Sequence, residues 1–446
     1  MGHLFSAIFG WYDAEKRALK GPGAPLIAGF GAWIGSIFNF DDIFSVRLIF
    51  FIISCFAAAG LYFLGLALFE SWRVGLLSSL TFIAFWGFGR FATSGPRAKT
   101  PMVLFEILAL IFAYHRNWFL SGAAAFLSLL VWQPSGIFLI VIALLSIFQS
   151  GKGLQRLRGI ALFMGGALAP GLLVLLYFIF HGAINEFLDG FLFAFTHLER
   201  SQKSLFNHFY RPIYAIFRGF WVMSIPIILG LYEIILLFSL RLKKFGNDVF
   251  LWLREDRLAA FLIAFPLIII WSLIDFQDFP DFFIFLPYAA IGFALVLDKY
   301  LRKKFVADAA KKAFVIVCVL LIVVSFFVYR FTAEEGLSKQ RKWAAKIDKE
   351  LIKDRNFASI GVPEILVLLK RTNPNPFIVI NGGIDQYIDS ITPKGFSGWL
   401  NELEQYNPSV IAFGRTKGRL KPAITSWLGK NYQEKKVGRW VLFVKP

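Results

Sequence analysis

The chain has 446 residues, of which 57% are hydrophobic and 18% aromatic, and its formal net charge is +18 at pH 7. Soluble proteins are only about 45–50% apolar, so this composition excludes an ordinary soluble fold and indicates a membrane protein. The two cysteines, Cys55 and Cys318, lie inside apolar runs, which argues against a disulfide framework or a cysteine metal site. The positive charge fits basic cytoplasmic loops better than nucleic-acid binding.

Hydropathy predicts a polytopic α-helical membrane protein with about ten spans and a small extramembrane α/β domain at the C-terminus. We expect an external N-terminal segment at 1–42, a transmembrane helical domain at 43–330 and an external α/β domain at 331–446. The predicted spans are 43–69, 73–89, 101–116, 118–133, 135–148, 159–180, 214–240, 258–274, 279–297 and 312–329. Several are shorter than the ~20 residues that a perpendicular helix needs, and 118–148 is alternatively one broken unit around "WQPSG".

Lysine and arginine in the connecting loops predict the orientation. The loops "QSGKGLQRLRG", "RLKKFGNDVFLWLREDR" and "DKYLRKKFVADAAKK" together carry fourteen basic residues, whereas the alternate loops, 181–213 and "DFQDFPD", carry three. Basic loops stay in the cytoplasm. The sequence therefore predicts that the alternate loops, the 89–100 loop, the Gln133-Pro134 turn and the C-terminal domain lie outside.

Three cations contradict this charge rule. Arg90, Arg97 and Lys99 lie in the stretch "GFGRFATSGPRAKTPMVLFE", which the loop tally places outside. One interpretation is contact with lipid headgroups. The other is an anion site, because phosphate prefers clustered guanidinium and ammonium donors and the N–H groups at the start of a helix.

The outer loop at 181–213 is amphipathic and rich in phenylalanine, which favours a position in the membrane interface. His197, Glu199 and His208 are candidate metal ligands, but their spacing matches no standard motif. Polar residues of the interface are the favoured interpretation, so we expect no metal and no cofactor.

The pattern of the C-terminal segment, 331–446, predicts a small α/β domain with a largely parallel sheet. Strands are predicted at "FASIG", "FIVI" and "VIAFG", with a final strand or hairpin at "KKVGRWVLFVK". Helices are predicted at "LSKQRKWAAKIDKELIKD", "PEILVLLKR", "SGWLNELEQY" and "PAITSWLGKNY". "NGGID" lacks the spacing of a nucleotide-binding loop.

Together these features resemble the C-type membrane glycosyltransferases that use polyprenyl-phosphate sugars, and most closely the bacterial proteins similar to dolichol-phosphate-mannose mannosyltransferases. The matching stretches are "YDAEKRALKGPGAPLIAGFGAWIG" with "FSVRL", "SGPRAKTPMVLFE", "WFLSGAAAFLSLLVWQPSG" and "DFQDFPDFFIFLPYAAIG". In that family a first span and an external acidic motif precede the "YxD…KGP" stretch, which here starts at Tyr12. The expectation is therefore a chain that starts late or a degenerate member of the family.

The resemblance implies transfer of a sugar from a polyprenyl-phosphate donor to a glycan, lipid or protein acceptor on the outer face. A carboxylate would deprotonate the acceptor hydroxyl, and cations would stabilise the leaving phosphate. Asp13 and Glu15 are the candidate catalytic acids, and Arg90, Arg97 and Lys99 the phosphate-binding residues. Trp132, Gln133 and Asp281 are candidates for binding the sugar, although Asp281 also suits a helix cap and the Trp132–Gln133 pair a packed turn.

Two other functions remain open at this stage. The missing acidic motif favours a non-catalytic membrane subunit or scaffold on the same fold, which would assemble with other subunits in the lipid bilayer. A transporter is the third possibility, but no inverted repeat is visible and few ionisable residues lie within the spans. Binding of nucleic acid is not expected.

Overall fold

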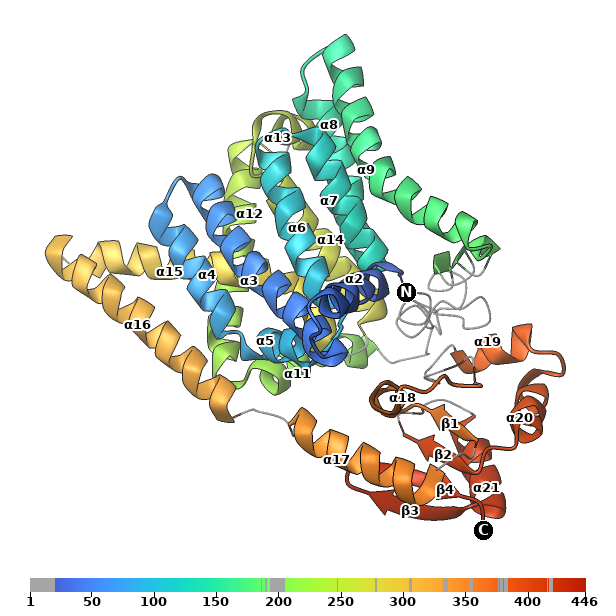
Figure 1. The fold of residues 1–446 in the computed structure, drawn as a ribbon. Helices are drawn as coiled ribbons and strands as arrows, with labels where there is room; N and C mark the ends of the chain where they lie inside the picture. Colours follow the sequence, from blue (N-terminus) through green and yellow to red (C-terminus); the bar gives the residue numbers. More distant parts are fainter. Residues whose placement is uncertain are drawn as a thin grey trace. The chain divides into compact units, whose positions relative to one another are not determined.

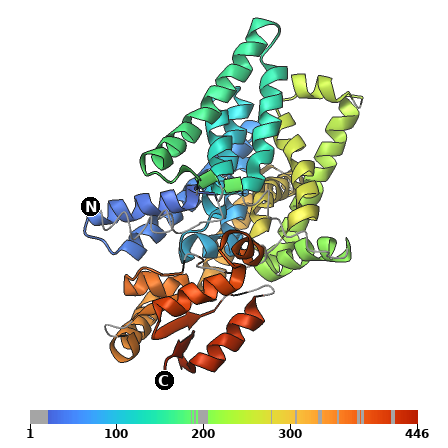
Figure 2. The same ribbon diagram turned by 90° about the vertical axis from the view of Figure 1, so that its right-hand side faces the viewer.

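The computed structural model describes residues 21–185, 187–188, 191–192, 205–246, 248–276, 279–304, 307–331, 336–352, 356–375, 377, 380, 384–414, 416 and 420–446. The chain divides into two compact units, one containing residues 21–180 and 202–332 and the other containing residues 333–446. The first is a bundle of helices, and the second combines helices with a β-sheet (Figures 1 and 2).

All ten predicted apolar runs fall on helices of the first unit. Its elements are α2 (Gly23–Ile37), α3 (Asp42–Phe69), α4 (Trp72–Ala84), α5 (Trp86–Ser94), α6 (Lys99–Tyr114), α7 (Trp118–Val131), η1 (Gln133–Ser135), α8 (Gly136–Gln149), α9 (Leu154–Phe180), α11 (Leu205–Phe220), η2 (Trp221–Met223), α12 (Ser224–Lys244), α13 (Val249–Glu255), α14 (Ala259–Asp275), η3 (Phe279–Phe285), α15 (Leu286–Lys304) and α16 (Ala307–Phe331).

Fewer helices than predicted are long enough to cross a membrane. Within the described residues, five are long and apolar enough, and α4 with α5, bent by 62° at Phe85, makes a sixth if the pair is one span. Helices α6, α7 and α8 have 16, 14 and 14 residues. At 1.5 Å per residue they extend only about 21–24 Å, against a hydrocarbon core of about 30 Å. The total of ten spans therefore remains a prediction.

The segment expected to be an external N-terminal extension, 1–42, contains an unpredicted helix. Helix α2 has four glycines among its 15 residues, which lowers its intrinsic helix propensity. It forms because the glycines allow close packing on α3: a Cβ at Gly31 would lie 3.2 Å from the Cα of Val46. Tertiary packing thus overrides local propensity. Residues before Gly21 lie outside the described part of the chain.

Small residues also bring α7 and α9 together. A Cβ on Gly122 would collide with the carbonyl oxygen of Phe163, and a Cβ on Gly166 would collide with that of Phe119. Packing between membrane helices relies on such close backbone approach, because lipid tails are as apolar as the side chains they replace. Helices α7 and α9 lie side by side in both views (Figures 1 and 2).

The second unit contains α17 (Leu337–Ile347), a single π-helical turn at Asp348–Ile352, β1 (Phe357–Ile360), α18 (Pro363–Leu369), α19 (Ile384–Ile391), α20 (Gly395–Tyr406), β2 (Val410–Phe413), α21 (Lys421–Asn431), β3 (Gln433–Val437) and β4 (Trp440–Val444). The predicted helices appear as α17, α18, α20 and α21, while α19 was not predicted. Buried side chains pack on both faces of the sheet in two clusters, one around Trp399 and one around Trp440.

The expectation of a largely parallel sheet is wrong for the described strands, whose order is β1-β2-β4-β3. Only β1 and β2 are parallel, and β4 is antiparallel to both β2 and β3. The reason is the turn between β3 and β4, where Gly438 has φ +57° and closes a tight hairpin. Of the four residues of the predicted "FIVI" strand, 378 and 379 lie outside the described residues, and Phe377 and Ile380 are not assigned to a strand.

Candidate functional site

The predicted cation cluster follows the bend in the helix pair α4–α5. Arg90 lies on α5, which ends at Ser94, and Gly95 adopts φ +144° to begin a short turn. Arg97 lies in this turn, where its carbonyl accepts a hydrogen bond from the amide of Thr100 at 3.1 Å. Lys99 is the first residue of α6. Two cations, Arg97 and Lys99, are therefore held at the N-terminal end of one helix.

A layer of phenylalanine rings attaches η3 to this turn. The Phe91 ring on α5 lies 5.0 Å from that of Phe279 and 5.6 Å from that of Phe283, centroid to centroid. A Cβ on Gly219 of α11 would collide with the Phe279 ring, and a Cβ on Gly87 would collide with the Gly219 carbonyl oxygen. The two glycines thus permit α5, α11 and η3 to pack at close range.

This packing brings Asp281 to Lys99. The Asp281 carboxylate forms an ion pair with the Lys99 ammonium, although 182 residues separate them in the sequence. Only 4% of Asp281 is exposed. A cation at a helix N-terminus is opposed by the helix dipole, so Asp281 offsets an unfavourable position. The pair places Asp281, the last residue of the acidic "DFQDFPD" stretch, next to the basic turn.

Trp132 completes the environment of Lys99. The Lys99 Nζ atom lies 5.0 Å from the centroid of a Trp132 ring, within cation–π range. Trp132 packs edge-on against Trp271 of α14, at 4.9 Å and an interplanar angle of 86°. The ion pair therefore lies beside the Trp132 ring, which in turn packs on Trp271. The sequence analysis did not predict Trp271 as a site residue. The signal that could have identified it is its position near the end of a predicted span, where tryptophan is enriched.

Gln133 follows Trp132 at the start of η1. Its side-chain Nε2 is buried and has no hydrogen-bond partner among the described residues. The hydroxyl of Thr100, the residue after Lys99, is likewise buried and has no hydrogen-bond partner among the described residues. Buried polar groups in proteins are rarely left without a partner. No described residue therefore uses the hydrogen-bonding capacity of these two atoms.

The two arginines lie against aromatic rings. The Arg97 guanidinium carbon is 5.1 Å from the centroid of Phe91, and that of Arg90 is 5.8 Å from Trp86. Arg97 is exposed, whereas Arg90 is partly buried. Stacking on a ring fixes the plane of a guanidinium group.

Some predicted residues cannot be placed. Asp13 and Glu15 lie outside the described residues, as do His197 and Glu199, and the side chain of His208 is not described. Over the rest of the chain, no group of three or more His, Cys, Asp or Glu side chains is arranged to hold a metal ion.

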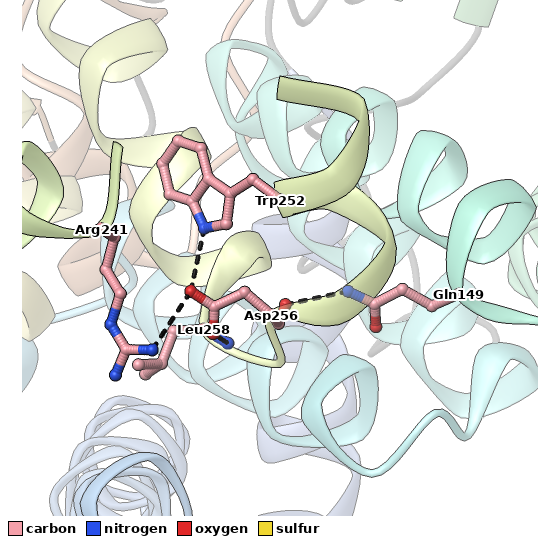
Figure 3. Close-up of polar contacts among 5 residues, drawn as sticks. All are labelled: Gln149, Arg241, Trp252, Asp256 and Leu258. Atoms are coloured by element: carbon pink, nitrogen blue, oxygen red, sulfur yellow. Dashed lines mark hydrogen bonds and ion pairs between the residues drawn. The ribbon is translucent and has the colours of Figure 1, made fainter. Parts of the chain in front are cut away.

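A second polar cluster lies at the other end of α6, where Arg257 stacks on Tyr114 at 5.8 Å. The buried Asp256 carboxylate accepts hydrogen bonds from Trp252 Nε1 at 2.9 Å and from the Leu258 amide at 3.0 Å (Figure 3). Arg241 Nη1 lies 3.5 Å from the same carboxylate. Gln149 Nε2 donates to the Asp256 carbonyl oxygen at 3.0 Å. Because its polar groups are satisfied by the protein, this cluster fastens α8, α12, α13 and α14 together.

No protein-family model and no curated protein matches the sequence at a significant level. Solved structures do match. ArnT from Cupriavidus metallidurans bound to undecaprenyl phosphate aligns with a TM-score of 0.55 at 13% identity, over 99% of this chain and 92% of ArnT. The apo state of ArnT aligns with a TM-score of 0.56 at 14% identity, over 96% of this chain and 88% of ArnT.

The oligosaccharyltransferase of Archaeoglobus fulgidus, tethered to an acceptor peptide, aligns with a TM-score of 0.47 at 12% identity, over 88% of this chain and 60% of its own; a likeness that loose carries no weight. At the identities found for ArnT, the likeness establishes the fold and no more. The chain therefore has the fold of ArnT, a C-type membrane glycosyltransferase.

Proposed function

We propose that this protein is a membrane glycosyltransferase that transfers a sugar from a polyprenyl-phosphate donor to an acceptor. The observation that carries the proposal is the Lys99–Asp281 ion pair beneath the Trp132 ring, with Arg97 on the same turn. It combines donors for a phosphate with an aromatic surface and a carboxylate that suit a sugar. The ArnT fold around it supports the proposal, since that protein binds undecaprenyl phosphate.

In this proposal the donor phosphate binds to Arg97 and Lys99 at the N-terminus of α6, together with Arg90 of the preceding helix α5. Guanidinium groups bind phosphate oxygens through two parallel hydrogen bonds, and the helix N-terminus adds a favourable dipole. Charge builds on the phosphate as the glycosidic bond breaks, so these cations stabilise the transition state.

The sugar would lie against Trp132 and Trp271. An indole face covers the apolar face of a sugar ring, while Asp281 accepts hydrogen bonds from hydroxyl groups and Gln133 Nε2 donates one. Asp13 and Glu15 remain our candidates for the base that deprotonates the acceptor. From the loop charges we infer that the reaction takes place on the outer face of the membrane.

The proposal is tested by measuring undecaprenyl phosphate binding to the purified full-length protein in detergent. One charge-assisted hydrogen bond is worth about 1.5–3 kcal/mol, which corresponds to roughly 10–150-fold in affinity. We expect Arg97→Ala to weaken binding by at least about tenfold, and Arg97→Lys to weaken it less, because lysine keeps the charge but loses the bidentate geometry.

Arg257→Ala is the matched control, because Arg257 is also exposed and also stacks on an aromatic ring, but at the far end of α6. It should bind undecaprenyl phosphate like the unmodified protein. Equal affinities for Arg97→Ala and Arg257→Ala would contradict the phosphate site. Normal binding without release of undecaprenyl phosphate from its sugar conjugates would contradict catalysis and favour a non-catalytic subunit.

A further inference from the structure

The first helix of the second unit, α17, has a basic face that the proposed function does not use. Lys339, Lys342 and Lys346 are all exposed and follow one another at intervals of three and four residues. Because an α-helix has 3.6 residues per turn, this spacing places the three side chains on one face, which we call the lysine stripe. No aspartate or glutamate occurs in α17, so the helix itself supplies no charge that neutralises the stripe.

The opposite face of α17 packs on the second unit itself. Ala344 and Ile347 are buried, and the Trp343 ring lies 6.1 Å, centroid to centroid, from that of Trp440 on β4. Leu337, the remaining large apolar residue of α17, is partly buried. The helix therefore presents no large apolar side chain for insertion into lipid. Its outward contacts depend on charge.

The stripe is unfavourable for the helix on its own. Like charges three or four residues apart on a helix repel each other and destabilise it. The acid that follows α17, Asp348, already accepts a hydrogen bond from Arg371 Nη2 at 3.0 Å. Lys349, in the same π-helical turn as Asp348, is exposed and adds a further positive charge. A negative partner outside the second unit would relieve this repulsion.

The chain keeps the stripe within reach of a membrane. The preceding helix, α16, is long and apolar enough over residues 308–327 to cross a bilayer. It ends at Phe331, and α17 begins at Leu337. A connection of this length extends at most about 20 Å. Whatever the orientation of the second unit, α17 thus begins close to the membrane surface at which α16 ends.

We propose that the lysine stripe binds the headgroups of anionic phospholipids at that surface. Basic segments next to a membrane span are attracted to anionic lipid over about a Debye length. Lysine suits this role, because its ammonium group is a point charge that needs no fixed geometry, unlike the bidentate contacts of arginine. The contact would hold the second unit against the bilayer. The stripe lies in the second unit and Arg97 in the first, so the two can be varied separately.

Fluorescence quenching in lipid nanodiscs tests the proposal on the full-length protein. A cysteine replaces exposed Ala345, between the lysines, after Cys55 and Cys318 have been replaced by serine, and carries a fluorescent label. The nanodiscs contain phosphatidylcholine with a spin label on its headgroup, with or without one part in three of phosphatidylglycerol. We expect stronger quenching with phosphatidylglycerol, and loss of the difference at 0.5 M NaCl, where the Debye length is only about 4 Å.

The triple variant Lys339→Gln/Lys342→Gln/Lys346→Gln should quench equally in both lipids. Each lysine near an anionic surface changes the ratio of bound to detached helix by about fivefold, so the three together change it by roughly a hundredfold. Equal quenching of the unmodified stripe in the two lipids would overturn the proposal, and an acidic protein would then be the better partner.

A matched control removes the same charge elsewhere in the second unit. It replaces with glutamine three exposed lysines of α21 and β3, namely Lys421, Lys430 and Lys436. This variant should keep the difference between the two lipids. An equal loss in both triple variants would show that the net charge of the unit acts, not the stripe, and would also overturn the proposal. The nanodiscs contain no undecaprenyl phosphate, so the result is independent of the proposed function.

Discussion

At the scale of single residues, two buried aspartates show how different environments lead to different roles. Asp256 is surrounded by donors from the protein itself, from Trp252, Leu258 and Arg241. Asp281 is paired with Lys99 in a place where Gln133 and Thr100 still have polar atoms without partners. The first arrangement is complete and structural. The second has bonding capacity left, as a binding site requires.

Asp256→Ala should therefore destabilise the folded protein strongly. Removing one partner of a buried charge pair typically costs about 3–5 kcal/mol, because the remaining groups lose their partners in a place without water. We expect a lower unfolding temperature in detergent, with undecaprenyl phosphate affinity retained in the protein that remains folded.

Asp308→Ala provides the comparison for Asp256→Ala. Asp308 also pairs with a cation, Lys311, but both side chains are exposed, at 91% and 69%. Exposed pairs contribute about 0–1 kcal/mol, so the unfolding temperature should hardly change. Similar losses in Asp256→Ala and Asp308→Ala would contradict a structural role for the Asp256 cluster.

At the scale of secondary-structure elements, backbone contact between helices positions the site. Trp132 directly follows α7, and α7 is held against α9 by contacts that only glycine permits. The adjacent residues Gly165 and Gly166 of α9 differ sharply in this respect. A Cβ on Gly166 would collide with the Phe119 carbonyl, whereas a Cβ on Gly165 would make an ordinary contact of 3.9 Å with the Phe119 ring.

We predict that Gly166→Ala lowers the unfolding temperature clearly, because a carbonyl of the neighbouring helix must move to admit the methyl group. Overpacking of this kind costs about 1–3 kcal/mol. Gly165→Ala should leave stability unchanged or raise it by up to about 1 kcal/mol, because alanine is the better helix former. Thermal unfolding of the two variants side by side measures the difference. The reverse order of stability would show that α7 and α9 are not packed through Gly166.

At the scale of the whole molecule, the loop charges predict which regions face the outside. We expect the second unit to be external, so that an impermeant maleimide labels a cysteine at the exposed position Ser390 in intact cells. A cysteine at exposed Lys303, in the last turn of α15 within the basic "DKYLRKKFVADAAKK" stretch, should react only after lysis. Both native cysteines, Cys55 and Cys318, are replaced by serine beforehand. Labelling of Lys303→Cys with protection of Ser390→Cys would invert the topology.

The sequence by itself determined the membrane class, the helical runs and the residues that gather at the start of α6. Apolar runs and loop charges are properties of local stretches, so they can be recognised without knowledge of the tertiary contacts. The sequence also singled out Lys99, Trp132 and Asp281, because each is polar or aromatic at the end of an apolar run. Their residue types suggested a site, but the pairing of Lys99 with Asp281 across 182 residues did not follow from any local pattern.

Only the tertiary structure decided the remaining features. Helix α2 forms because its glycines pack on α3, against their own propensity. The sheet is mixed because a hairpin reverses its last strand, and Trp271 joins Trp132 because α14 passes beside η1. Each of these features depends on a contact between segments that are far apart in the chain. The free energy of such a contact depends on the shapes of the two surfaces and on how closely they approach.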